Sequence, residues 1–143
     1  MTITALPDPS TPFGERVRTR LRDERLIWWT TVGADGTPQP NPVWFLQDDD
    51  GILIYNRQDA HRLNHIRERP QVSLNFDAAS DGGDIVVLRG RARQLEDQPL
   101  PHENPAYLEK YAEAMVEVSG SPEEFSAVYF VPVRIEITRV RGF

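Results

Sequence analysis

The chain has 143 residues, a formal net charge of −6 and no cysteine. This length fits one domain with a single core. The absence of cysteine excludes disulfides, thiolate nucleophiles and cysteine-ligated metals. The negative charge argues against a nucleic-acid binder, which needs a basic surface to displace counterions. The sequence shows no apolar run of membrane-spanning length, and residues 1–12 do not resemble a signal peptide. We therefore expect a cytoplasmic protein with no membrane association.

The first half of the chain is rich in strand signals. Its pattern predicts, in chain order, an N-terminal arm over 1–12, a helix over 13–25 and strands over 26–33, 38–47 and 52–57. Strand 26–33 is apolar on both faces, which indicates that one face packs in the barrel interior and the other against something outside the barrel. Pro38, Pro40 and Pro42 remove three donors from one side of the next strand, so its first half should lie at a sheet edge.

The second half alternates between helices and strands. The pattern predicts a helix over 60–69 with Asp59 as its N-cap, strands over 71–77 and 84–96, a helix from Asn104 to Ser119, a short helix starting at Ser121 and a last strand over 127–140. Gly90 is expected to form a bulge or bend. Tight turns between successive strands favour an antiparallel meander that closes on itself. The predicted fold is therefore mainly β, a β-barrel with flanking helices, in one domain over 13–143.

No familiar catalytic constellation is visible. The chain has no GxSxG elbow, no P-loop and no GxGxxG after a strand. His61 and His65 are four residues apart on one helix face, but only a weak third ligand is in view, so no metal site is predicted.

The best chemical candidate is an anion site over Tyr55–His65. Arg57 ends a strand, the following helix start offers free N–H groups, and Arg62 lies in the first helical turn. A phosphate there would gain backbone donors and guanidinium forks. Asp59, as N-cap, would compete for the same donors. Taken singly, each arginine is better explained as a solvated surface charge.

Several segments in fixed order carry a family resemblance. They are TPQPNPVWF at 37–45, the strand end Tyr55-Asn56-Arg57 and the helical segment RLNHI at 62–66. The segment Arg67-Glu68-Arg69-Pro70, which ends that helix, and the strand start QVSL at 71–74 follow. This order resembles the pyridoxamine 5′-phosphate oxidase-like split barrels over roughly residues 15–143. The ending over 132–143 resembles the branch that uses the deazaflavin coenzyme F420.

The resemblance implies an FMN-binding split-barrel fold and a homodimer with cofactor sites at its interface. It assigns the cofactor phosphate to Arg62, with further contacts at Tyr55, Asn56, Arg57, His61 and His65. The ring system is expected near Thr30, Thr31, Val43 and Trp44. The glutamate tail of F420 would need a further arginine, for which Arg89, Arg91 and Arg93 are candidates.

The implied activity is hydride transfer from reduced F420 to a small organic substrate, with no catalytic residue of the protein's own in that step. The product's proton would come from solvent or from Tyr55. FMN in the same pocket is the nearest alternative. Another is a non-catalytic carrier or sensor of a flavin, haem or tetrapyrrole, with His61 or His65 as an axial haem ligand. The last alternative is a structural dimerisation domain, in which Trp28, Trp29 and Trp44 only pack the core and the interface.

Overall fold

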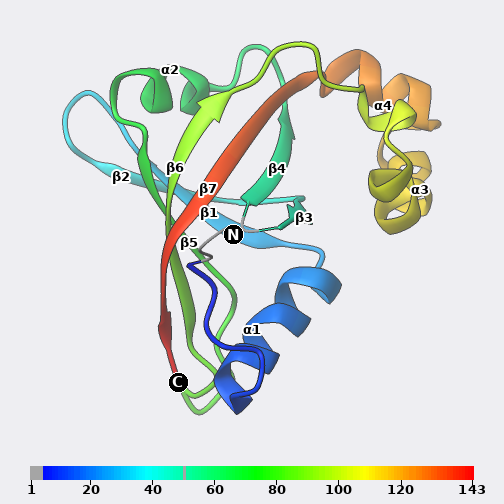
Figure 1. Ribbon diagram of the computed structural model, residues 1–143. Helices are drawn as coiled ribbons and strands as arrows, with labels where there is room; N and C mark the ends of the chain where they lie inside the picture. Colours follow the sequence, from blue (N-terminus) through cyan, green and yellow to red (C-terminus); the bar gives the residue numbers. More distant parts are fainter. Residues whose placement is uncertain (1–4, 50) are drawn as a thin grey trace.

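The computed structural model describes residues 5–49 and 51–143, and its centre is a curled sheet (Figure 1). Seven antiparallel strands lie in the order β2-β1-β5-β6-β7-β4-β3. Their bounds are β1 Ile27–Val32, β2 Pro38–Val43, β3 Leu46–Asp48, β4 Gly51–Asn56, β5 Gln71–Asn75, β6 Val86–Gln94 and β7 Val131–Gly142. The edge strands β2 and β3 follow one another in the chain, so the sheet forms a half-barrel. The mainly β prediction is confirmed.

Helices flank the sheet on several sides. They are α1 Pro12–Asp23, α2 His61–Glu68, the 3-10 turn η1 Pro101–Glu103, α3 Pro105–Ser119 and α4 Pro122–Val128. Thr11, Asn104 and Ser121 cap α1, α3 and α4, each accepting a hydrogen bond from a first-turn N–H. The caps predicted at Asn104 and Ser121 are therefore confirmed. No helix in the described ranges is long and apolar enough to cross a membrane.

Most boundaries differ from the sequence prediction by one or two residues, and three differences have a structural cause. The N-cap of α2 is Ala60, not Asp59, because the Asp59 carboxylate pairs instead with Arg57 at 3.2 Å. The predicted strand 38–47 breaks between Val43 and Leu46, where the chain turns from β2 into β3. The last strand starts at Val131 rather than 127, because α4 continues to Val128.

Two other predictions concern strand irregularities. Strand β2, with its three prolines, is an edge strand of the sheet, as predicted. The register between β6 and β7 shifts between Arg89 and Gly90, which confirms the bulge. A Cβ at Gly90 would come within 2.4 Å of the Ile135 side chain and 2.9 Å of the Glu136 carbonyl oxygen. Glycine is required there because the neighbouring strand passes so close.

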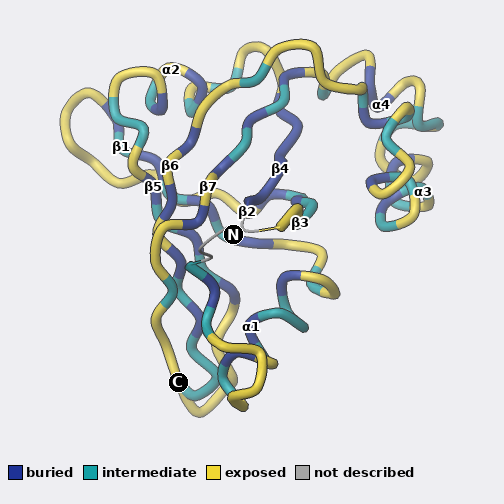
Figure 2. Tube along the Cα trace, in the orientation of Figure 1, coloured by how far each residue is buried: buried dark blue, intermediate teal, exposed yellow. Residues whose placement is uncertain are grey.

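The main core lies inside the curl of the sheet. Buried residues follow the strands, whereas the tip of the β1–β2 hairpin is exposed (Figure 2). Val17 and Leu21 of α1 enter this core and are fully buried. Leu6, from the predicted arm, is also buried against it. The arm's residues 1–4 lie outside the described residues.

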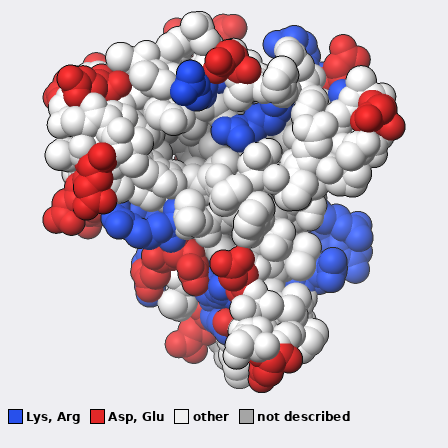
Figure 3. All heavy atoms as spheres, turned by 180° about the vertical axis from the view of Figure 1, so that it is seen from behind, with Lys and Arg blue, Asp and Glu red and all other residues white. Residues whose placement is uncertain are grey.

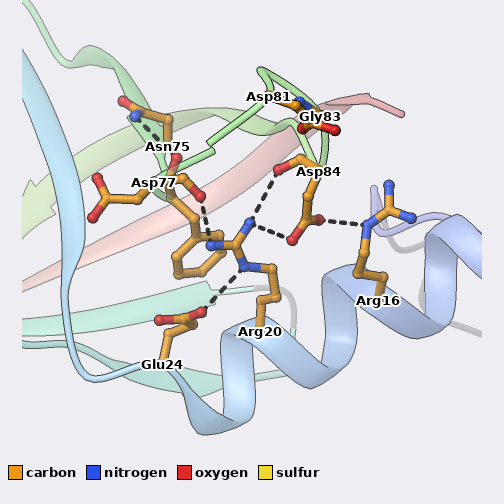
Figure 4. Close-up of polar contacts among 9 residues, drawn as sticks. Arg16, Arg20, Glu24, Asn75, Asp77, Asp81, Gly83 and Asp84 are labelled. Carbon is orange, nitrogen blue, oxygen red and sulfur yellow. Dashed lines mark hydrogen bonds and ion pairs between the residues drawn. The ribbon is translucent and has the colours of Figure 1, made fainter. Parts of the chain in front are cut away.

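Helix α1 is fastened to the β5–β6 connection by two arginines (Figure 4). Arg16 Nε lies 2.7 Å from Asp84 Oδ1, and Arg20 Nη1 lies 3.3 Å from Asp84 Oδ2. Arg20 also donates to the carbonyl oxygen of Asp77 at 2.7 Å. Only 12% of the Arg20 side chain is exposed, so these bonds are less screened than those of an ordinary surface pair.

Helices α3 and α4 form a separate lobe beside β4, with a second apolar cluster beneath it. Tyr107, Tyr111, Met115 and Phe125 are buried there against β4. The Tyr111 hydroxyl donates to the Arg25 carbonyl oxygen at 2.7 Å and accepts from the Phe45 N–H at 2.9 Å. The lobe is therefore held to the β2–β3 corner by both packing and hydrogen bonds.

Lys110 lies in the same contact between α3 and the β2–β3 corner. Its ammonium donates to the Phe45 carbonyl oxygen at 3.0 Å and lies 3.8 Å from the centre of the Phe45 ring. Burial, and to a smaller extent the charge of Arg25, lowers the pKa of Lys110 to about 8. The ring face, which favours a cation, opposes part of this effect.

We expect the free energy of unfolding to rise with pH above about 8 because of Lys110. In that range the folded chain has released the lysine proton, whereas the unfolded chain keeps it up to a pKa of about 10.4. The unfolded state then binds more protons, so stability increases with pH until both states are neutral. Urea denaturation of the wild type and of Lys110→Met at a series of pH values checks this. Equal pH slopes for the two proteins would contradict it.

Candidate cofactor site

A pocket of about 300 Å³ lies where the sheet meets the lobe of α3 and α4. It is lined by Leu26, Pro42, Val43, Trp44, Tyr55, Arg62, Val118, Phe125 and Tyr129. Seen from behind, a hollow separates this lobe from the body of the molecule, and acidic side chains gather on the lobe (Figure 3). Arg62 is the single charged side chain of the lining. An apolar pocket with few polar groups is typical of a small-molecule site.

Arg62 is held in place by a buried asparagine. Its Nε donates to Asn56 Oδ1 at 2.7 Å. Asn56 is fully buried at the end of β4, and its Nδ2 donates to the carbonyl oxygens of Ile54 and Val131 at 3.0 and 3.2 Å. Because these bonds engage the amide nitrogen, the amide oxygen faces Arg62. The fold therefore sets the direction in which the guanidinium points.

The charge of Arg62 is incompletely compensated. The side chain is half-buried, and burial lowers the pKa of its guanidinium. Within residues 5–49 and 51–143, no carboxylate pairs with it and its two terminal nitrogens make no hydrogen bond. A guanidinium nevertheless stays protonated in proteins. A partly buried cation without a counter-ion is costly, so this position favours an anionic ligand.

The pocket walls are aromatic. Tyr111, Trp44, Phe125 and Tyr129 form a column of stacked rings, with successive centroids 4.8, 5.1 and 4.6 Å apart. Phe125 and Tyr129 belong to the end of the lobe, and sequence reasoning missed both. Their i, i+4 spacing on a short helix was the available signal, but nothing in it showed which surface that helix would cover.

Tyr129 also links the two arginines of the predicted anion site. Asp59 and then the Tyr129 hydroxyl raise the pKa of Arg57 by hydrogen bonding, and Tyr129 acts electrostatically on Arg62. Arg57 itself is exposed and paired with Asp59. Arg57 therefore lies at the rim of the predicted anion site, whereas Arg62 lies inside the pocket.

Tyr55 lines the pocket with its hydroxyl engaged elsewhere. That hydroxyl donates to the Pro99 carbonyl oxygen at 2.7 Å and accepts from Asn104 Nδ2 at 3.2 Å. Burial raises the pKa of Tyr55. The hydroxyl is therefore poorly placed to donate a proton to a product.

The remaining predicted residues are separated from this pocket. Thr31 is buried, and its hydroxyl lies 2.9 Å from Nδ1 of His65. Thr30 points to the face of β1 opposite to that of Thr31 and lines a different hollow, and His61 is exposed at the start of α2. The structure thus brings Val43, Trp44, Tyr55 and Arg62 together, with Asn56 behind Arg62. Among the described residues, no three histidine or acidic side chains form a metal-binding group.

The curled seven-stranded antiparallel sheet with its flanking helices has the form of half a β-barrel. The family model of pyridoxamine 5′-phosphate oxidase matches residues 13–142, so the chain belongs to that family. No curated protein sequence matches the chain significantly.

Solved structures with the same fold have low sequence identity. A conserved hypothetical protein of Mycobacterium tuberculosis superposes with a TM-score of 0.71 at 18% identity, covering 99% of this chain and 88% of that one. An F420 reductase has a TM-score of 0.59 at 19% identity, covering 87% and 94%. The haem storage protein HutZ of Vibrio cholerae has a TM-score of 0.64 at 13% identity, covering 92% and 95%. Such similarities show the fold alone.

Proposed function

We propose that the chain is an F420-dependent reductase that passes a hydride from the reduced deazaflavin to a small organic substrate. The observation that carries this proposal is Arg62, a half-buried guanidinium directed by Asn56 and without a carboxylate partner among the described residues. Arg62 would hold the cofactor phosphate. The match to a phosphate-binding oxidase family and the similarity to an F420 reductase support the assignment.

The pocket residues suit a flat, uncharged ring next to a phosphate. Trp44 and Phe125, whose faces are covered by neighbouring rings of the column, offer ring edges, and Tyr129, Tyr55 and Val43 complete the lining. A bound deazaflavin supplies a hydride to an electron-poor carbon, as nicotinamides do. The protein's own part is to bind the phosphate, orient the ring and exclude water, which matches the aromatic walls. Contacts from Thr30, Thr31, Arg57, His61 and His65 remain predictions.

We further propose that the protein acts as a homodimer that covers the mouth of the pocket. Two lining residues at that mouth are large and exposed, Leu26 at 52% and Val118 at 60%. Adjacent exposed apolar side chains mark interaction surfaces. The outer face of β1, which the sequence predicts to be covered, is only partly buried within one chain.

Titration with separate cofactors tests the proposal. The purified protein should quench F420 fluorescence at low micromolar concentration and change FMN fluorescence little. Tight FMN binding without F420 binding would reassign the cofactor. Haem binding with a histidine-dependent Soret shift, and no binding of either flavin-type cofactor, would instead favour a carrier like the haem storage protein. Sedimentation of the apo and loaded protein measures the oligomeric state.

A further inference from the structure

Lys110 is the single lysine of the chain, which has 16 lysines and arginines together. The others are arginines, and four of them, on β6 and β7, line one hollow of the sheet. A guanidinium stays protonated in proteins, whereas a lysine amine can lose its proton and then act as a nucleophile. Among these side chains, only Lys110 can therefore form a covalent bond through its nitrogen at neutral pH.

Lys110 lies outside the Arg62 pocket, in the contact between α3 and the β2–β3 corner. Its side chain is half-buried, and its nitrogen lies 3.8 Å from the centre of the Phe45 ring and 5.3 Å from that of Tyr111. One N–H donates to the Phe45 carbonyl oxygen at 3.0 Å. That bond engages an N–H and leaves the lone pair of the neutral amine free. The fold therefore holds a potential nucleophile in a partly desolvated, ring-lined position.

A neighbouring cation, Arg25, opposes the protonation of Lys110. The Arg25 guanidinium lies 5.8 Å from the centre of the Tyr111 ring, and Arg25 Nη2 donates to the Lys110 carbonyl oxygen at 2.7 Å. Two cations therefore approach one ring. Asp23 and Glu24 act in the opposite direction, but each pairs with an arginine of α1, at 2.8 and 3.3 Å. Within residues 5–49 and 51–143, no carboxylate pairs with Lys110.

These surroundings make Lys110 less basic than an exposed lysine. Burial and, to a smaller extent, Arg25 lower its pKa to about 8. At pH 7 about a tenth of the amine is then neutral, against less than about 0.1% for an ordinary lysine. The neutral amine is the nucleophilic form. Because the side chain is half-buried, small reagents reach the amine more readily than bulky ones.

We propose that Lys110 is a modification site that takes a small acyl group from an activated donor, an acyl thioester or an acyl phosphate. The neutral Nζ attacks the carbonyl carbon of the donor, and an N–C amide bond forms. The bond from that carbon to sulfur, or to the phosphate oxygen, breaks, and the thiol or phosphate leaves with the electron pair. The surplus proton on nitrogen passes to water. The amide product keeps one N–H for the Phe45 carbonyl oxygen and loses the positive charge.

The experiment measures the rate at which Lys110 becomes acetylated. Acetyl phosphate and acetyl-coenzyme A are used in separate arms over a range of pH, and mass spectrometry of peptides separates Lys110 from the α-amino group. The same reactions in urea give the rate for the unfolded chain. Arg67→Lys adds an exposed lysine on α2 as a reference within the same molecule. Arg25→Gln removes the neighbouring cation. Circular dichroism and melting temperature verify that both variants fold.

We expect native Lys110 at pH 7 to react about tenfold faster than the lysine introduced at position 67, and about tenfold faster than Lys110 in urea. This is less than the gain in neutral amine, because partial burial and lower basicity reduce the rate. The pH–rate profile should have its midpoint near 8 in the native protein and near about 10.4 in urea. Arg25→Gln should slow the native reaction by about twofold to fivefold.

The proposal is overturned if native Lys110 reacts no faster than the lysine at position 67, or faster in urea than in the native protein. Either result would show that the fold shields the amine instead of activating it. A native midpoint near 10 would overturn it as well. Reaction with one donor alone supports the site and identifies the donor class. Since no arm contains a cofactor, the outcome is independent of the proposed function. If Arg25→Gln does not fold, the urea and Arg67→Lys comparisons still decide.

Discussion

Arg62→Ala is expected to weaken cofactor binding by about 1.5–3 kcal/mol, roughly 10- to 150-fold in Kd. The variant removes the one charged side chain of the pocket. It also leaves Asn56 Oδ1, buried and oriented by two backbone bonds, without its donor. Fluorescence titration with F420, and with FMN for comparison, measures the change.

Arg67→Ala is the matched control for this experiment. Arg67 lies on the same helix and carries the same charge, but it is exposed, and among the described residues it bonds to Asn64 alone, at 3.1 Å. Its removal should leave the Kd within about twofold. Arg62→Lys keeps the charge and loses the planar fork, so an intermediate affinity is expected. If Arg62→Ala bound as tightly as Arg67→Ala, the phosphate would have to lie elsewhere.

Phe125→Ala is expected to lower the free energy of unfolding by about 3–5 kcal/mol, the usual range for removing a buried phenylalanine. Phe125 is 4% exposed, and its ring stacks on Trp44 at 5.1 Å and on Tyr129 at 4.6 Å. It therefore joins the lobe to the β2–β3 corner and forms one wall of the pocket. We expect the same variant to lose cofactor affinity even where it remains folded. Denaturant unfolding, with and without cofactor, measures both effects.

Val128→Ala separates the role of Phe125 from general damage to α4. Val128 ends the same helix and is 39% exposed, so its truncation should change stability by no more than about 0.5 kcal/mol. Phe125→Leu keeps most of the volume and removes the ring stacking. A small stability loss for Phe125→Ala, comparable to that of Val128→Ala, would show that the lobe is not held by this ring.

Local sequence signals predicted most of the fold. Pro105 after Asn104 and Pro122 after Ser121 marked helix starts, because capping depends only on residues within one turn. The three prolines of β2 marked an edge strand, because a missing N–H excludes a central position. Asp59 misled the prediction, since its carboxylate had a second partner, Arg57, two residues away.

The candidate site was predicted only in its local part. Asn56 and Arg62 are six residues apart, and their contact crosses one strand-to-helix turn, which sequence order makes visible. Phe125 and Tyr129 come from a lobe inserted between β6 and β7, more than sixty residues later. No local pattern fixes which surface such a lobe covers, because that depends on side-chain packing against β4 and Trp44.

The sequence by itself determined a cysteine-free, acidic, mainly β chain, the starts of α3 and α4, and the cluster of basic residues after β4. These properties depend on composition, on periodicity and on contacts within a turn. The tertiary structure decided that Arg62 faces a pocket while Arg57 remains at its rim, and that four arginines of β6 and β7 share one hollow. Strand register and the packing of the lobe set those positions, and both arise from contacts between residues distant in the chain.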